Sequence, residues 1–144
     1  MELIRLAEEF DVGAIASFDH VAQCDHKRVA FIQRSIANRD CYIAIADNMI
    51  VGYAVLDYSF YENGFISMLY VHPEHRRRGV GEELIKYLEG VCRTTKLFTS
   101  ANLSNTAMQP LLAKLGYEQS GVIHNLDEND PELVYFKLLK QKAV

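Results

Sequence analysis

The stretch that decides the fold reads ISMLYVHPEHRRRGVG and covers residues 66–81. Its first six residues are mostly apolar, as in a buried strand, and three consecutive arginines, Arg76–Arg78, follow the proline. Gly79 and Gly81 then begin an amphipathic pattern that predicts a helix over residues 79–94. The first N–H groups of a helix lack helical partners and bear partial positive charge. Because glycine lets an anion approach the backbone and arginine adds forked donors, this junction predicts a site for a pyrophosphate or a similar polyanion.

The spacing of these glycines excludes two common phosphate-binding motifs. The P-loop requires a lysine followed by serine or threonine, and the dinucleotide fingerprint requires a third glycine where this chain has Leu84. The arginine triplet alone would indicate a solvated loop. The complete order of strand, proline, arginines, two glycines and helix favours the anion site instead.

The remaining sequence predicts a mixed α/β domain. Asp11 is expected to cap a helix whose apolar positions include Ile15, Phe18 and Val21. Further helices are expected over residues 27–37, 79–94 and 105–115. Apolar runs predict strands over residues 2–6, 41–46, 50–57, 65–71, 97–101, 117–122 and 133–139.

Two short polar pairs predict how the early strands connect. Turns at Asp47–Asn48 and Asn63–Gly64 would join neighbouring strands as hairpins. The helix over residues 79–94 instead lies between two strands, and a crossover of that length implies at least one parallel pair.

The composition is typical of one globular domain over residues 1–144. Hydrophobic residues make up 49% of the chain and charged residues 24%, which excludes a disordered protein. The 15 basic and 19 acidic residues give a net charge of −4, and such an acidic chain is a poor general binder of nucleic acid. No apolar run approaches the roughly 20 residues that cross a bilayer, and the N-terminus shows no signal peptide. We therefore expect a cytoplasmic protein with neither a nucleic-acid nor a membrane partner.

The cysteines and histidines do not form a recognisable ligand set. Cys24, Cys41 and Cys92 are odd in number and widely spaced, which predicts reduced thiols. No cysteine or carboxylate cluster accompanies His72 and His75, so no metal is expected.

Two motifs resemble those of a known superfamily. The pattern R-x-x-G-x-G and the preceding L-x-V-x-P are similar to the acetyl-CoA-binding motif of the GNAT superfamily of N-acyltransferases. Residues 105–117, an asparagine opening a helix that ends in glycine and an aromatic residue, resemble its next motif. The element order matches over nearly the whole chain. The resemblance implies an α/β (α+β) fold with a mixed, mostly antiparallel central sheet, a splayed parallel pair and about four flanking helices. The first motif is represented here by Leu69, Val71, Pro73, Arg76, Gly79 and Gly81.

The resemblance also implies how acetyl-CoA, the co-substrate, would bind. Backbone groups of residues 69–71 would pair with the pantetheine amides, as an added strand does. Backbone N–H groups of residues 76–82 would surround the pyrophosphate. Two asparagines would hydrogen-bond the pantetheine arm or the phosphates. The expected acetyl-CoA-binding residues are Leu69, Tyr70, Val71, Arg76, Arg77, Arg78, Gly79, Val80, Gly81, Glu82, Asn102 and Asn105.

The general acid is not where the superfamily usually has it. A tyrosine often stands four residues before the closing glycine, and this chain has Leu112 there. Tyr70, Glu62 and Ser100 are the candidate catalytic residues, because each stands beside the expected site on a strand or just before one. Each also has an ordinary interpretation as a packed or solvated residue. His72 is a less favoured base.

The acidic segment over residues 124–132 is expected to border the binding site of the acceptor amine. Its carboxylates would attract a cationic amine, and Asn125 and Asp127 are the favoured contacts. A solvated hairpin loop is the alternative.

We expect an N-acetyltransferase that transfers the acetyl group directly to a primary amine in a ternary complex, since no cysteine stands beside the acetyl-CoA motif. The acceptor would be a small-molecule or peptide amine, such as an amino acid, an antibiotic or a protein N-terminus. The resemblance also implies that the protein forms a homodimer. A non-catalytic acyl-CoA-binding sensor and a polyanion- or RNA-binding module are the alternatives.

Overall fold

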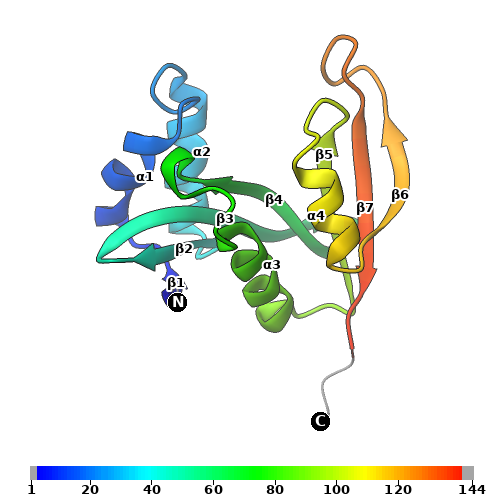
Figure 1. Ribbon diagram of the computed structural model, residues 1–144, viewed down its shortest axis with the longest axis horizontal. Helices are drawn as coiled ribbons and strands as arrows, with labels where there is room; N and C mark the ends of the chain where they lie inside the picture. Colours follow the sequence, from blue (N-terminus) through cyan, green and yellow to red (C-terminus); the bar gives the residue numbers. More distant parts are fainter. Residues whose placement is uncertain (1–2, 141–144) are drawn as a thin grey trace. The chain divides into compact units, whose positions relative to one another are not determined.

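The computed structural model describes residues 3–140, which form one seven-stranded sheet and four α-helices (Figure 1). The strand order is β1-β2-β3-β4-β5-β7-β6, mostly antiparallel with one parallel pair, β4 and β5. This confirms the predicted fold class. The strands are β1 (Leu3–Leu6), β2 (Cys41–Ala46), β3 (Met49–Phe60), β4 (Asn63–Val71), β5 (Lys96–Asn102), β6 (Glu118–Ile123) and β7 (Glu132–Leu138). The helices are α1 (Val12–Phe18), α2 (His26–Ala37), α3 (Val80–Val91) and α4 (Met108–Lys114), with 3-10 turns η1 (Glu9–Asp11) and η2 (Pro73–His75).

The chain divides into two compact units, and β3 and β4 run through both. The first unit comprises residues up to 56 and 68–90, and the second comprises 57–67 and those from 91 onward. A single domain over residues 1–144 stays a prediction, and the predicted start of β1 at Glu2 lies outside the described residues.

The core of the first unit lies between α1, α2 and the strands. Ile15, Ile32, Ile43 and Tyr53 are fully buried there. On β3, a Cβ added to Gly52 would lie 3.0 Å from a methyl group of Val80, so the glycine lets α3 pack directly on the strand.

The second unit contains the parallel pair and the C-terminal hairpin. β4 and β5 pair from Gly64 with Leu97 to Ile66 with Thr99, although both strands continue further. β5 pairs along its whole length with β7, and β7 pairs with β6 (Figure 1). The Thr99 hydroxyl donates to the carbonyl oxygen of Ile66 at 2.9 Å, which adds a side-chain hydrogen bond at the end of the parallel ladder.

The turn predicted at Asn63–Gly64 is wrong, because both residues belong to β4. The turn is formed by Tyr61 and Glu62, whose φ angles are 53° and 66°, as in a two-residue hairpin. Gly64 serves close packing instead, since a Cβ there would lie 2.5 Å from Cys92 Sγ. The turn at Asp47–Asn48 is confirmed, with φ angles of 52° and 61°.

Two helix predictions also need correction. α1 ends at Phe18, so Val21 does not belong to this helix, and its side chain is 37% exposed. Asp11 precedes α1 but makes no side-chain cap, because its carboxylate is paired with Arg5. α4 begins at Met108 rather than at residue 105, which places Pro110 in its first turn, where a missing N–H costs no helical hydrogen bond.

Candidate functional site

The junction between β4 and α3 has the backbone that an anion site requires. Arg77 and Gly79 adopt left-handed conformations with φ angles of 65° and 84°. A Cβ at Gly79 would meet nothing within 4 Å, so conformation rather than packing favours glycine there. The helical bonding of α3 begins where Glu83 N–H donates to the carbonyl oxygen of Gly79 at 3.0 Å. The N–H groups of residues 80–82 therefore precede the helical ladder, as in other helix N-termini that receive anions.

The three arginines at this junction differ in their contacts. All are exposed. Arg76 Nε donates to the carbonyl oxygen of Val71 at 3.1 Å, and its guanidinium lies 5.4 Å from the ring centroid of Tyr70. The Arg76 side chain therefore packs against the end of β4. Arg77 and Arg78 have no side-chain partner in the described part of the chain, which leaves two positive charges available to a phosphate. The junction therefore fits a polyanion.

One polar atom on β4 also lacks a partner. The Ser67 hydroxyl is buried and makes no hydrogen bond with the described residues. Such an atom is costly unless something satisfies it. It stands two residues before Leu69, where the backbone was predicted to bind the pantetheine arm. Sequence reasoning missed Ser67, because a serine inside an apolar strand gives no signal of being unpaired.

The Tyr70 ring is held on several sides within the first unit. Its centroid lies 6.2 Å from that of Phe18 and 6.2 Å from that of Tyr53. Its hydroxyl oxygen accepts a hydrogen bond from the backbone N–H of His20 at 3.2 Å. His72 packs on Phe18 at 5.1 Å between centroids, so the less favoured base belongs to the same aromatic cluster.

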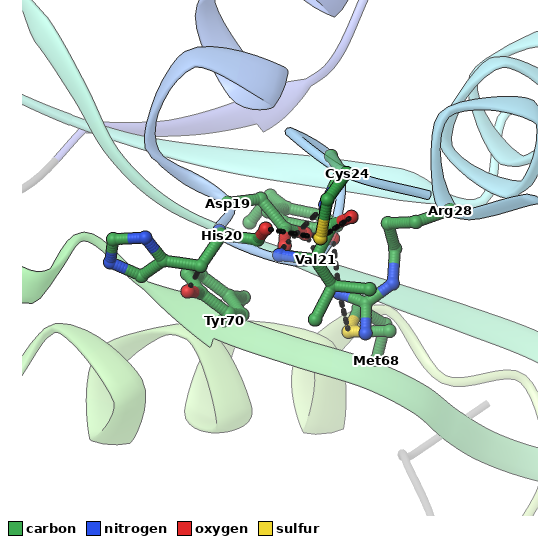
Figure 2. A network of polar contacts seen from close by, with 9 residues as sticks. Asp19, His20, Val21, Cys24, Arg28, Met68 and Tyr70 are labelled. Atoms are coloured by element: carbon green, nitrogen blue, oxygen red, sulfur yellow. Dashed lines mark hydrogen bonds and ion pairs between the residues drawn. The ribbon is translucent and has the colours of Figure 1, made fainter. Parts of the chain in front are cut away.

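A buried charged network adjoins this cluster (Figure 2). The Asp19 carboxylate is fully buried and pairs with Arg28 Nη1 at 2.7 Å, and the Tyr53 hydroxyl donates to the same carboxylate. Burial, together with that carboxylate, raises the pKa of Tyr53, which keeps the phenol protonated. Arg28 Nη1 also lies 3.7 Å from the Met68 sulfur on β4. Sequence reasoning missed this network, because its members are far apart along the chain.

The other two candidate catalytic residues lie in the second unit. Glu62 is exposed in the turn before β4. Ser100 is half-buried on β5, opposite Val134 of β7. β4 pairs with β5 only from Gly64 to Ile66, so Glu62 stands outside the ladder to which Ser100 belongs.

The acidic loop between β6 and β7 lines an open pocket of about 440 Å³. Asn102 Nδ2 donates to the Asp127 carboxylate at 2.9 Å. The hydroxyl of Ser104 donates to Asp130 at 2.6 Å. The pocket is lined by His124, Asn125, Asp127, Glu128, Asn129, Asp130 and Pro131.

Both asparagines that were predicted to contact acetyl-CoA make hydrogen bonds within the chain. Asn102 donates its amide to the acidic loop, while Asn105 Oδ1 accepts from the N–H of Met108, the first residue of α4, at 3.2 Å. Their binding roles stay predictions. Among residues 3–140 no helix is long and apolar enough to span a membrane. In the same range, no three histidine, cysteine or acidic side chains are grouped as metal ligands.

Comparisons with known proteins agree with this arrangement. The family model described as the acetyltransferase (GNAT) family matches residues 3–117. A search of curated proteins gives no significant match. A GNAT-family acetyltransferase from Bacillus cereus is 33% identical, with a TM-score of 0.91 over 98% of this chain and 99% of that one.

Two more distant structures share the fold. One is the ribosomal-protein-S18-alanine N-acetyltransferase from Escherichia coli, 17% identical, with a TM-score of 0.79 over 99% of this chain and 97% of that one. The other is yncA from Salmonella typhimurium, a putative acetyltransferase solved with its cofactor acetyl-CoA. It is 19% identical, with a TM-score of 0.76 over 100% of this chain and 97% of that one. Since the family model covers well over half of the sequence, the chain belongs to the GNAT family of acetyltransferases.

Proposed function

We propose that the protein transfers the acetyl group of acetyl-CoA to a primary amine, by direct attack of the amine in a ternary complex. The observation that supports this most is the junction between β4 and α3. It combines left-handed backbone at Arg77 and Gly79, N–H groups that precede the helical ladder, and two arginines without partners in the described chain.

Acetyl-CoA would bind along β4 and at the start of α3. The backbone of residues 69–71 would receive the pantetheine arm, and the Ser67 hydroxyl would gain the partner it lacks. Arg77, Arg78 and the N–H groups of residues 80–82 would hold the pyrophosphate. Glu82 does not oppose this, because its carboxylate is paired with Lys86 at 3.2 Å. The acyl donor supplies a thioester carbonyl carbon, which an amine attacks.

Direct transfer fits the state of the cysteines. A covalent acyl-enzyme needs a reactive thiolate. Burial raises the pKa of the Cys41 thiol to about 12, and Cys92 is also buried. Cys24 is exposed, and its thiol contacts the carbonyl oxygens of His20 and Val21 at 3.5 and 3.6 Å. None of the three stands in the β4–α3 junction.

The acceptor would be a small-molecule or peptide amine in the cytoplasm. The pocket of the acidic loop is lined by Asp127, Glu128 and Asp130, and these carboxylates would attract an ammonium group. Asn125 lines the same pocket.

The test measures product and free thiol together. The protein is incubated with acetyl-CoA and a panel of primary alkylamines, free amino acids and short peptides with free N-termini. Mass spectrometry detects the acetylated amine, and a thiol reagent detects free CoA, with a blank lacking amine because Cys24 also reacts. Equal release of CoA and acetylated amine supports the proposal. Tight acetyl-CoA binding without product from any amine would contradict it.

That second result would favour a non-catalytic acyl-CoA-binding sensor. The observation behind this alternative is Leu112, which is fully buried on α4 and has no proton to donate at the position of the usual tyrosine.

A further inference from the structure

The Asp19 carboxylate is buried beside the candidate site, yet it has no capacity left to act as a base. Its Oδ1 accepts from the N–H groups of Val21 and Ala22 at 2.9 and 3.2 Å. Its Oδ2 accepts from Arg28 and from the Tyr53 hydroxyl. A carboxylate offers about four lone-pair sites. All of them are used, so the chemistry of Asp19 is to hold its neighbours in place.

The segment that Asp19 holds is the turn after α1, residues 19–22. Two bonds fix Asp19 to the N–H groups within this turn, one fixes it to Tyr53 on β3, and one fixes it to Arg28 on α2. Between these anchors, the backbone N–H of His20 is directed at the Tyr70 hydroxyl oxygen, 3.2 Å away (Figure 2). The His20 side chain itself is exposed. The network therefore acts on Tyr70 through the backbone of His20.

This contact determines what the Tyr70 hydroxyl can do. A tyrosine hydroxyl has one proton to donate and accepts through its oxygen. Here the oxygen accepts from His20, and the proton has no acceptor among the described residues. The ring is fixed as well, by stacking with Tyr53 and by the Arg76 guanidinium 5.4 Å from its centroid. Tyr70 is thus a fixed hydroxyl whose proton remains available, on the part of β4 where acetyl-CoA would bind.

We propose that Asp19 is a positioning residue for acetyl transfer: through the turn at residues 19–22 it fixes the Tyr70 hydroxyl, which acts as the general acid for the leaving thiolate. This inference rests on the proposed function. The amine nitrogen forms a bond to the thioester carbonyl carbon, and the C–S bond breaks with its electron pair on sulfur. Tyr70 gives its proton to that sulfur, the new amide nitrogen loses a proton to water, and water returns a proton to Tyr70.

The test is a double-mutant cycle with a matched control. Tyr70→Phe removes only the hydroxyl, and general-acid catalysis contributes about 100-fold or more, so kcat should fall ~100-fold with KM for acetyl-CoA unchanged. Asp19→Asn should lower kcat about 10-fold, and adding it to Tyr70→Phe should lower kcat no further, because it acts through the hydroxyl. Tyr53→Phe keeps the ion pair, removes one bond to Asp19 and should show a smaller effect in the same direction, so it substitutes if Asp19→Asn fails to fold.

The control is the other Arg–Asp pair of the first unit. Arg5 and Asp11 pair at 2.9 Å, with the Asp11 side chain almost as buried as that of Asp19. Asp11→Asn should lower the melting temperature and leave kcat unchanged. Equal losses of kcat in the Asp11 and Asp19 variants would show a general stability effect and overturn the proposal.

A readout without turnover separates the two proposals. In NMR spectra of the ¹⁵N-labelled protein, Asp19→Asn should shift the His20 amide signal and speed its hydrogen exchange, and should shift the Tyr70 ring signals. Asp11→Asn should leave them in place. An unchanged His20 amide in Asp19→Asn would overturn the positioning role even if the enzyme is active. A wild type that produces no acetylated amine would refute the proposed function and the catalytic role of Tyr70, whereas the NMR result would still decide whether Asp19 positions it.

Discussion

Replacing Gly81 with Asp should change the stability of the free protein and its affinity for CoA in different directions. Gly81 is the second residue of α3. In the free protein an aspartate there faces the positive end of the helix, where an acidic side chain stabilises by about 0.3–1 kcal/mol. Aspartate also has a higher helix propensity than glycine. We therefore expect the free variant to be at least as stable as the wild type.

The same carboxylate would repel a bound pyrophosphate. Residues 80–82 lie within one helical turn, so an aspartate at residue 81 would stand about 6 Å from a phosphate held by their N–H groups. At that distance and an effective dielectric constant of 20, two unit charges repel by about 3 kcal/mol. A difference of that size weakens binding about 100-fold.

The assay is calorimetric titration with CoA at two salt concentrations, alongside thermal unfolding. Gly90→Asp is the matched control, because it adds the same side chain near the other end of α3, where a Cβ meets nothing within 4 Å. Gly90→Asp should leave the Kd for CoA unchanged. Because salt screens the repulsion, the Kd values of Gly81→Asp and the wild type should differ less at the higher salt concentration. Wild-type affinity in Gly81→Asp would refute the anion site, and so would an equal loss in Gly90→Asp.

Three further changes test other parts of the molecule. Asp127→Asn should raise the acceptor KM several-fold without lowering kcat, and steady-state kinetics with cationic and neutral amines checks this; an unchanged KM removes the acidic loop from acceptor binding. Burial alone would raise the pKa of Asp11, but hydrogen bonds from Arg5 and a backbone N–H leave it lowered. A lowered pKa gives stability that is present above the ordinary value of 3.8 and is lost as the pH falls through the folded value. Urea midpoints of the wild type should therefore fall below pH 4 more steeply than those of Asp11→Asn, and parallel curves would contradict the pair's role. Gly64→Ala places a methyl group 2.5 Å from Cys92 Sγ and should destabilise by about 1–3 kcal/mol in urea unfolding; wild-type stability would show that the packing there relaxes.

The parts of the fold that could be predicted from sequence are those specified by local patterns. β2 was predicted residue for residue, because six apolar residues precede a two-residue turn. The β4–α3 junction was predicted because its arginines and glycines are contiguous. The turn before β4 was missed for the converse reason. An Asn–Gly pair is a strong local turn signal, but the packing of Gly64 against Cys92 makes that glycine a strand residue and moves the turn to Tyr61–Glu62.

The charged network could not be predicted from local patterns. Asp19 follows α1, Arg28 is on α2, Tyr53 is on β3 and Tyr70 is on β4, and no spacing along the chain connects them. Each residue also has an ordinary interpretation by itself, as a helix end, a surface cation or an apolar strand position. Their common function exists only once the strands and helices of the first unit have packed, because burial is what makes the Asp19 carboxylate depend on all four of its hydrogen bonds.

The departure at Leu112 now has a chemical consequence. A leucine that is fully buried on α4 donates no proton, so the residue in the usual tyrosine position cannot protonate a leaving thiolate. If the enzyme uses a general acid, another hydroxyl must supply it. Among the three catalytic candidates, Glu62 is exposed in a turn, and the Ser100 hydroxyl has no donor among the described residues that would fix its orientation. Tyr70 alone has its oxygen occupied by a fixed N–H donor and its proton without an acceptor among the described residues. We therefore propose that Tyr70 on β4 takes the role of the tyrosine that usually stands on α4, and that Asp19 positions it.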